Sequence, residues 1–149
     1  FGVEVIRAVK EVLPADMPVL MRISAKEYVQ DGYDVEYIAA IGERYRDAGV
    51  DIFHISSGVE GPIGSSGGPS ARAGYQVDLA HTIREKLNVP VIAVGLLDDY
   101  EDARRVVQHN EADLVAIGRA MLRDPYWALH ASRALKVQAD IPEPYLRGF

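Results

Sequence analysis

The hydrophobic positions of the 149-residue chain follow two alternating patterns. Where they recur every three or four residues, they predict amphipathic helices. Local signals set some of the bounds: Asp34 is typical of a helix N-cap, Gly49 of a helix end, and Asp124 with Pro125 of a further helix start. The helices predicted in this way cover residues 1–13, 35–48, 75–87, 99–109 and 125–137, with one further helical turn at 119–122.

Four shorter segments are predicted strands, and the first of them is apolar on both faces, which is typical of a strand buried in a parallel sheet. They cover residues 18–24, 51–55, 89–94 and 113–117. The chain is therefore read as a helix followed by four strand–helix units, and this regular alternation predicts a parallel sheet with helical crossovers. Both a doubly wound sheet and part of a (β/α)8 barrel fit this order.

The last two predicted strands favour the barrel. Each ends in glycine, at Gly95 and Gly118, and a one-turn helix follows the second. Barrels of this kind commonly bind phosphate with the loops after their last two strands and a short extra helix. A dinucleotide-binding doubly wound domain would carry a GxGxxG motif after its first strand, and none follows here. Because a whole barrel needs about 250 residues, we expect residues 1–149 to be the C-terminal half of a (β/α)8 TIM barrel.

Composition and charge narrow the choice of partners. The net charge is −6, with no basic stripe, which argues against nucleic acid. The chain has no cysteine and its four histidines lack metal-ligand spacing, so we expect neither a disulfide nor a metal site. No apolar run approaches the about 18 residues of a membrane span and no signal peptide is visible, so we expect a cytoplasmic protein without a membrane partner. The start at Phe1, inside a predicted helix, suggests a processed or excised segment.

Gly95, Gly118 and Arg119 are the first candidates for ligand binding. Glycine at the end of a strand lets a phosphate group approach backbone N–H groups closely. The short helix after Gly118 adds its dipole, and the guanidinium of Arg119 can bind phosphate oxygens as a fork. Glycines here could also simply form tight turns, but the pair together with the Gly-Arg sequence favours phosphate.

Arg22 lies in the middle of a predicted strand among apolar neighbours. A buried arginine needs an anionic or electron-rich partner, because an unpaired buried charge is costly. This partner could be a carboxylate, or the pyrimidine edge of a flavin, where arginine stabilises the reduced form. Ser56, at the end of the next strand, could bind a ligand or only cap the loop. His54 could face the helices instead of the barrel interior, which argues against a catalytic role.

Two irregular stretches stand out. Residues 56–74 are rich in glycine and serine, and a loop of this length in a compact domain is usually functional or mobile. Residues 138–149 form a proline-containing tail that ends in Arg147, Gly148 and Phe149. A tail arginine is usually only solvated, but this tail could instead dock onto a neighbouring subunit.

Together these segments resemble the C-terminal half of the Old Yellow Enzyme family, in particular its bacterial YqjM-like branch of NADPH dehydrogenases and ene-reductases. The matching stretches cover nearly the whole chain in order, and their combination is specific. They are VLMRISAKEY, GVDIFHISSG, AGYQVDLAHTIRE, VPVIAVGLL, ADLVAIGRAMLRDPYW and PYLRGF.

The resemblance implies an FMN-containing (β/α)8 barrel that takes hydride from NAD(P)H and reduces activated C=C bonds of enone-type substrates. It also implies a homo-oligomer, with Arg147 reaching the active site of a neighbouring subunit and residues 138–149 at the interface. The residues that it implies for FMN binding are Arg22 and Ser56 at the ring and Gly95, Gly118 and Arg119 at the phosphate.

The same resemblance leaves part of the active site outside this chain. The family's substrate-anchoring histidine/asparagine pair, its proton-donating tyrosine and its flavin-tuning cysteine or threonine lie in the N-terminal half, so no catalytic residue is expected here. We therefore expect the chain alone to be incomplete and to need the N-terminal half of the barrel as a partner. The loop at 59–72 also looks longer and richer in glycine than the family pattern.

Two other functions stay open from the sequence. One is another FMN barrel oxidoreductase, such as a dihydroorotate- or dihydrouridine-type enzyme, although SSG and the terminal Arg-Gly-Phe fit these poorly. The other is a half-barrel that binds phosphate compounds or flavin without catalysis. Bound flavin, visible in an absorption spectrum, would separate an FMN oxidoreductase from a protein that binds only phosphate compounds.

Overall fold

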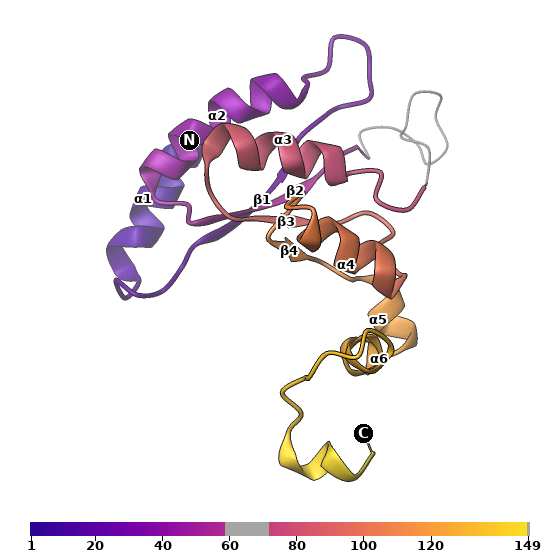
Figure 1. The fold of residues 1–149 in the computed structure, drawn as a ribbon. Helices are drawn as coiled ribbons and strands as arrows, with labels where there is room; N and C mark the ends of the chain where they lie inside the picture. The colour runs from indigo at the N-terminus through magenta and orange to yellow at the C-terminus, as the bar shows by residue number, and fades with distance from the viewer. Residues whose placement is uncertain (59–71, 149) are drawn as a thin grey trace.

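The four predicted strands form one parallel sheet in the computed structural model, which describes residues 1–58 and 72–148. Most of the glycine-rich loop and Phe149 therefore lie outside the described residues. The sheet has the order β1-β2-β3-β4 (Figure 1), with β1 at Leu20–Ser24, β2 at Ile52–Ser56, β3 at Val91–Ala93 and β4 at Leu114–Val115. Each strand pairs only with its neighbours in sequence, which is the barrel arrangement, whereas a doubly wound sheet reverses its strand order.

Helices connect the strands as the apolar periodicity predicts. Asp34 caps the second helix by accepting a hydrogen bond from the backbone N–H of Tyr37 at 3.1 Å, and Gly49 ends it in the left-handed conformation. Among the described residues, none of the helices is both long and apolar enough to cross a membrane. The helices are α1 at Gly2–Val12, α2 at Val35–Ala48, α3 at Val77–Leu87, α4 at Tyr100–Gln108, α5 at Arg119–Arg123, α6 at Trp127–Ala134 and the 3₁₀ helix η1 at Glu143–Gly148.

The last long helix is shorter than predicted at both ends. Asp124 and Pro125 belong to the turn before α6, where the carboxylate of Asp124 accepts a hydrogen bond from the backbone N–H of Tyr126 at 3.0 Å. This bond stabilises the turn instead of opening the helix at Pro125. At the other end, Lys136 adopts a φ of 55°, which takes the chain out of the helix before residue 137.

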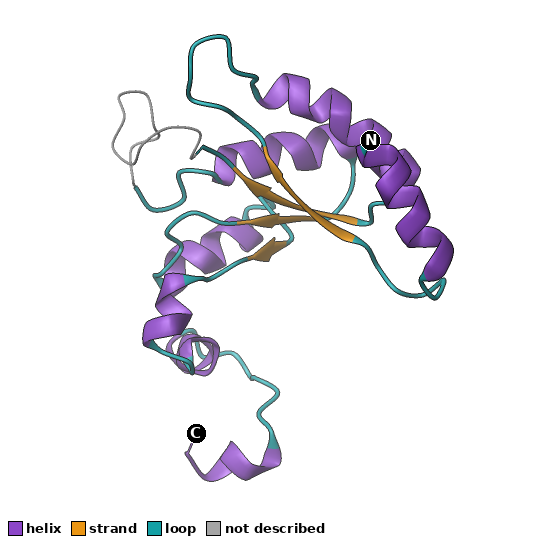
Figure 2. Ribbon diagram, turned by 180° about the vertical axis from the view of Figure 1, so that it is seen from behind, coloured by secondary structure: helices purple, strands orange, loops and turns teal. Residues whose placement is uncertain are grey.

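One face of the sheet is covered by helices and the other is open (Figures 1 and 2). Phe53, Ile55 and Val91 point to the covered face and are fully buried, because α1, α2 and α3 follow one another along that side. On the opposite face, Leu20 and Leu114 of the two edge strands remain 54% and 50% exposed. Apolar side chains so exposed on a sheet face indicate a surface that other protein segments cover in a complete barrel.

Asp51 connects the first two strands to α1 at the N-terminal end of the sheet. Its Oδ2 accepts hydrogen bonds from the backbone N–H of Val19 at 2.7 Å and from Nζ of Lys10 at 3.0 Å. The backbone bond from Val19, followed by the bond from Lys10, lowers the pKa of the Asp51 carboxyl. These two hydrogen bonds therefore favour the ionised form of the Asp51 carboxyl in the folded protein.

Asp113 makes the same connection between the last two strands and α3. Its Oδ2 accepts from the backbone N–H of Val91 at 2.9 Å and from Nε of Arg84 at 3.0 Å, while Oδ1 accepts from Nη2 of Arg84 at 3.1 Å. The hydrogen bonds from Arg84 lower the pKa of Asp113, and the backbone bond from Val91 adds to this effect. We refer to Asp51 and Asp113, with their partners, as the two aspartate ties.

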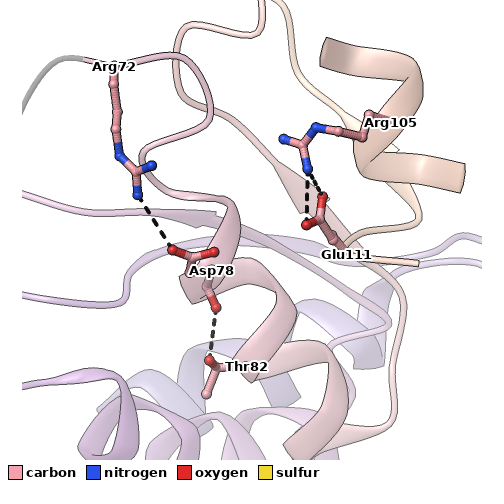
Figure 3. A network of polar contacts seen from close by, with 5 residues as sticks. All are labelled: Arg72, Asp78, Thr82, Arg105 and Glu111. Carbon is pink, nitrogen blue, oxygen red and sulfur yellow. Dashed lines mark hydrogen bonds and ion pairs between the residues drawn. The ribbon is translucent and has the colours of Figure 1, made fainter. Parts of the chain in front are cut away.

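Side-chain contacts also hold the segments that flank α3 and α4 (Figure 3). Arg105 of α4 donates two hydrogen bonds to the carboxylate of Glu111, at 2.8 and 3.1 Å, and so fixes the link from α4 to β4. Arg72 lies 3.8 Å from the carboxylate of Asp78, whose backbone carbonyl accepts from the hydroxyl of Thr82 at 2.8 Å. The Arg72–Asp78 pair is exposed and contributes little to stability, whereas the Arg105–Glu111 pair, in which Nη1 contacts both carboxylate oxygens, is better shielded.

Candidate functional site

The C-terminal ends of the strands surround one cavity of about 340 Å³. We call it the strand-end cavity. It brings together all five residues that the sequence singles out for cofactor binding, although they come from β1, the ends of the three other strands and a short helix. These residues are Arg22, Ser56, Gly95, Gly118 and Arg119.

The two glycines of the cavity serve different purposes. Gly95 has a φ of 128°, and a Cβ on it would lie 3.3 Å from the backbone nitrogen of Gln76, so the turn itself requires glycine. Its carbonyl accepts a hydrogen bond from the N–H of Gly74 at 2.7 Å. A Cβ on Gly118 would meet nothing within 4 Å. The surrounding protein atoms would therefore allow a side chain at position 118. A ligand that approaches the backbone there would explain why the residue is glycine.

Two arginines border the cavity from opposite edges of the sheet. Arg22 comes from β1, and Arg119 opens α5 directly after Gly118. Within residues 1–58 and 72–148, the guanidinium of Arg119 makes no hydrogen bond or ion pair, so its donors are available to a ligand. Asp98 also lines the cavity, but its carboxylate is paired with Arg123. The arrangement favours an anionic ligand that extends across the strand ends.

His54 lies on the same face of the sheet as Arg22, so an orientation toward the helices is wrong. The two residues are direct partners in the β1–β2 register, and Nη1 of Arg22 lies 3.2 Å from Nε2 of His54. Phe53 and Ile55 occupy the covered face, which leaves the open face to the residue between them. Burial, followed by the positive charge of Arg22, lowers the pKa of His54 and favours its neutral form.

The two serines after β2 make different contacts. The hydroxyl of Ser56 donates to the backbone carbonyl of Ile23 on β1 at 3.3 Å, and its oxygen can still accept a hydrogen bond at the cavity. The hydroxyl of Ser57 is buried and lies 3.0 Å from the hydroxyl of Tyr28. Ser56 thus joins two strand ends, while Ser57 connects β2 to the loop after β1.

Gln76 is a cavity residue that the sequence reasoning missed. Its side chain is only 4% exposed, and its Nε2 donates to the carbonyl of Ser57 at 3.2 Å and to the hydroxyl of Tyr75 at 3.0 Å. It immediately precedes α3, which begins at Val77 and not at residue 75. A polar residue at a helix start normally faces water, so no local signal indicates that Gln76 is buried between two strand ends.

Arg147 does not approach the strand-end cavity of its own chain. It lies on η1, whose residues are all exposed and which projects away from the sheet (Figure 1). The ring of Tyr145 lies 6.2 Å from that of Tyr126, so the tail makes contact near the start of α6. Arg147 therefore lies apart from the cavity in the described part of the chain, and its contact with a neighbouring subunit stays a prediction.

The fold defines this chain as part of a (β/α)8 barrel, with a cavity at the carboxyl ends of its strands. Residues 1–138 match the family model described as "NADH:flavin oxidoreductase / NADH oxidase family", and the chain belongs to this family. The match confirms the resemblance to the Old Yellow Enzyme family. Flavin and NAD(P)H are the cofactors of that family.

Curated relatives support this assignment along nearly the whole chain. An NADPH dehydrogenase of Clostridium acetobutylicum is 39% identical over 147 residues, which are 98% of this chain and 42% of that protein. An NADPH dehydrogenase of Geobacillus thermodenitrificans is 40% identical over 146 residues, 98% of this chain and 41% of that protein. An NADH oxidase of Thermoanaerobacter brockii is 36% identical over 128 residues, 85% of this chain and 20% of that protein.

The chain thus spans 41–42% of the length of the two NADPH dehydrogenases, which agrees with a partial barrel. A solved structure of a 2-naphthoyl-CoA reductase in complex with 2-naphthoyl-CoA has a TM-score of 0.77 to this chain at 20% identity. The similarity covers 91% of this chain and 20% of that one. At this identity it supports the fold alone.

Proposed function

We propose that this chain forms the FMN-phosphate half of an NAD(P)H-dependent flavin oxidoreductase that reduces activated C=C bonds of enone-type substrates. The observation that carries the proposal is the meeting of Arg22, Ser56, Gly95, Gly118 and Arg119 around one cavity. Membership of a flavin oxidoreductase family supports the choice of FMN among phosphate-containing ligands.

The residues of the cavity fit the phosphate end of FMN. The open space at Gly118 allows a phosphate to approach the backbone, and Arg119 offers an unpaired guanidinium beside it. Arg22, at the other edge of the cavity, would hold the pyrimidine edge of the ring and stabilise negative charge there. Ser56 would accept or donate a hydrogen bond between these two positions. When bound, FMN supplies the hydride-transfer chemistry, and this chain binds and orients it.

The rest of the active site would come from the part of the barrel that this chain does not contain. The open sheet face and the exposed Leu20 and Leu114 on the two edge strands call for a further segment to cover them. In this proposal that segment supplies the proton donor and the substrate anchors, and the present chain supplies no catalytic residue. Arg147 would reach the substrate site of a neighbouring subunit in a homo-oligomer.

The matched pair Arg119→Ala and Arg123→Ala tests the phosphate site in the complete barrel. Both arginines lie on α5, but Arg119 lines the cavity whereas Arg123 pairs with Asp98. Loss of hydrogen bonds to a charged group costs about 1.5–3 kcal/mol, so Arg119→Ala should weaken FMN binding about tenfold to a hundredfold. Arg123→Ala should weaken FMN binding clearly less than Arg119→Ala, because Arg123 does not line the cavity and acts there only through the carboxylate of Asp98.

Flavin absorption at about 450 nm and NAD(P)H oxidation with an enone measure the two parts of the proposal. The 149-residue chain alone should show no turnover, because the substrate anchors are absent. A complete barrel without bound flavin, or equal FMN affinity of the parent and Arg119→Ala, would contradict the proposed site. Bound flavin without any NAD(P)H oxidation would favour a non-catalytic flavin-binding protein instead.

A further inference from the structure

The contact between Arg22 and His54 gives His54 a defined hydrogen-bonding role. An arginine guanidinium only donates hydrogen bonds, so the 3.2 Å contact requires Nε2 of His54 to be the acceptor. Nε2 can accept only when the imidazole is neutral and carries its proton on Nδ1. Burial and the neighbouring guanidinium both lower the pKa of His54, which is the condition that this tautomer needs.

The contact also restricts where Arg22 can point. The two residues face each other directly in the parallel register, so the side chain of His54 is fixed to the same sheet face by the strand pairing. One guanidinium nitrogen of Arg22 is held by His54, and the remaining donors stay available on the side of the strand-end cavity. A long arginine side chain without such an anchor would lose more conformational freedom when a ligand binds.

We propose that His54 is a positioning residue that holds the guanidinium of Arg22 toward the strand-end cavity by accepting a hydrogen bond on Nε2. This inference rests on the proposed function, because it assumes that Arg22 binds the pyrimidine edge of FMN. His54 itself does not line the cavity, and it acts on the flavin through Arg22. Its effect therefore disappears when Arg22 is removed.

The experiment uses the FMN-loaded complete barrel with His54→Leu, His54→Gln, Arg22→Met and the double variant His54→Leu/Arg22→Met. The midpoint potential of bound FMN and its dissociation constant are measured for each. His54→Leu should weaken FMN binding about fivefold to tenfold and make the potential more negative, because the positive charge is held less well at the ring. His54→Gln keeps an acceptor and should restore both values. In the Arg22→Met background, His54→Leu should change neither.

A second measurement tests the anchor without FMN. In the ligand-free complete barrel, ¹⁵N NMR of the His54 ring should show the proton on Nδ1, and this preference should weaken in Arg22→Met. If His54→Leu fails to fold, His54→Asn replaces it, because its amide is shorter than the imidazole and ends further from Nη1 of Arg22.

Three results would overturn the role of His54. They are parent-like affinity and potential in His54→Leu, an equal effect of His54→Leu with and without Arg22, and a proton on Nε2 in the ligand-free barrel. A different result separates this inference from the proposed function. If the parent binds no FMN, or Arg22→Met binds FMN as the parent does, the assumed role of Arg22 fails, whatever the His54 variants show.

Discussion

Gly118→Ala separates the requirements of a ligand from those of the fold. An added methyl group would meet no protein atom within 4 Å, and the φ of −95° at Gly118 does not require glycine. The substitution should therefore change the free energy of unfolding of the ligand-free complete barrel by no more than about 0.5 kcal/mol. If phosphate approaches the backbone at Gly118, the same methyl group occupies the space that the ligand needs.

Gly95→Ala is the contrasting variant. Its φ of 128° is unfavourable for any residue with a side chain, and a Cβ would lie 3.3 Å from both the nitrogen of Gln76 and a ring carbon of Tyr75. Holding a non-glycine residue in such a conformation costs about 1–3 kcal/mol. Gly95→Ala should therefore lower the stability of the ligand-free protein by about this amount, whereas Gly118→Ala should not.

Urea denaturation of the ligand-free barrel and fluorescence titration with FMN measure the two effects separately. We expect Gly118→Ala to keep the parent's urea midpoint and to bind FMN at least about tenfold more weakly, which corresponds to about 1.4 kcal/mol. FMN affinity equal to that of the parent in Gly118→Ala would refute the assignment of the phosphate to this position. A large loss of stability in the ligand-free Gly118→Ala protein would refute the argument that the fold tolerates a side chain there.

Two further variants test a structural contact and a site contact. Asp113→Asn should destabilise the complete barrel by about 1 kcal/mol at pH 7, because a neutral amide cannot form the charge-assisted pair of hydrogen bonds that the partly exposed carboxylate forms with Arg84. The folded pKa of Asp113 lies below its ordinary value of 3.8, so this contribution is present above pH 3.8 and is lost as the pH falls through the lower folded pKa. The urea midpoints of the parent and Asp113→Asn should converge in that range, and a constant gap down to pH 2 would contradict the role of the carboxylate. Arg147→Ala should raise the KM for an enone about tenfold without changing the FMN content. Arg133→Ala, at another exposed arginine, is its control. An unchanged KM in Arg147→Ala would argue against a tail that crosses between subunits.

The strand ends were the part of the site that the sequence could predict. Gly95 and Gly118 follow apolar runs, and parallel strands bring their carboxyl ends to the same edge of the sheet, so a shared site follows from topology. Helix bounds were predicted well where one residue sets them, as at Asp34 and Gly49. At Asp124 the same residue type stabilises a turn instead, and sequence alone does not distinguish these two uses.

The residues that were missed depend on contacts between distant segments. Gln76 is buried because its amide meets the carbonyl of Ser57, which lies 19 positions earlier in the chain. The role of His54 depends on the exact register of β1 against β2, and that register pairs it with Arg22 across 32 positions. Local patterns in the sequence report which face a residue occupies, but they do not report which side chain lies opposite.

The two aspartate ties imply a modular architecture. In each tie, an aspartate that precedes one strand accepts hydrogen bonds from a backbone N–H at the previous strand and from a cationic side chain of the helix before that strand. The same two kinds of contact therefore recur in two successive parts of the chain, α1 to β2 and α3 to β4. Both ties lie at the amino ends of the strands, whereas the strand-end cavity lies at the carboxyl ends. Loops around the cavity can therefore be exchanged, lengthened or redesigned without removing the aspartate ties. This separation makes the segment a suitable scaffold for directed evolution of new specificities.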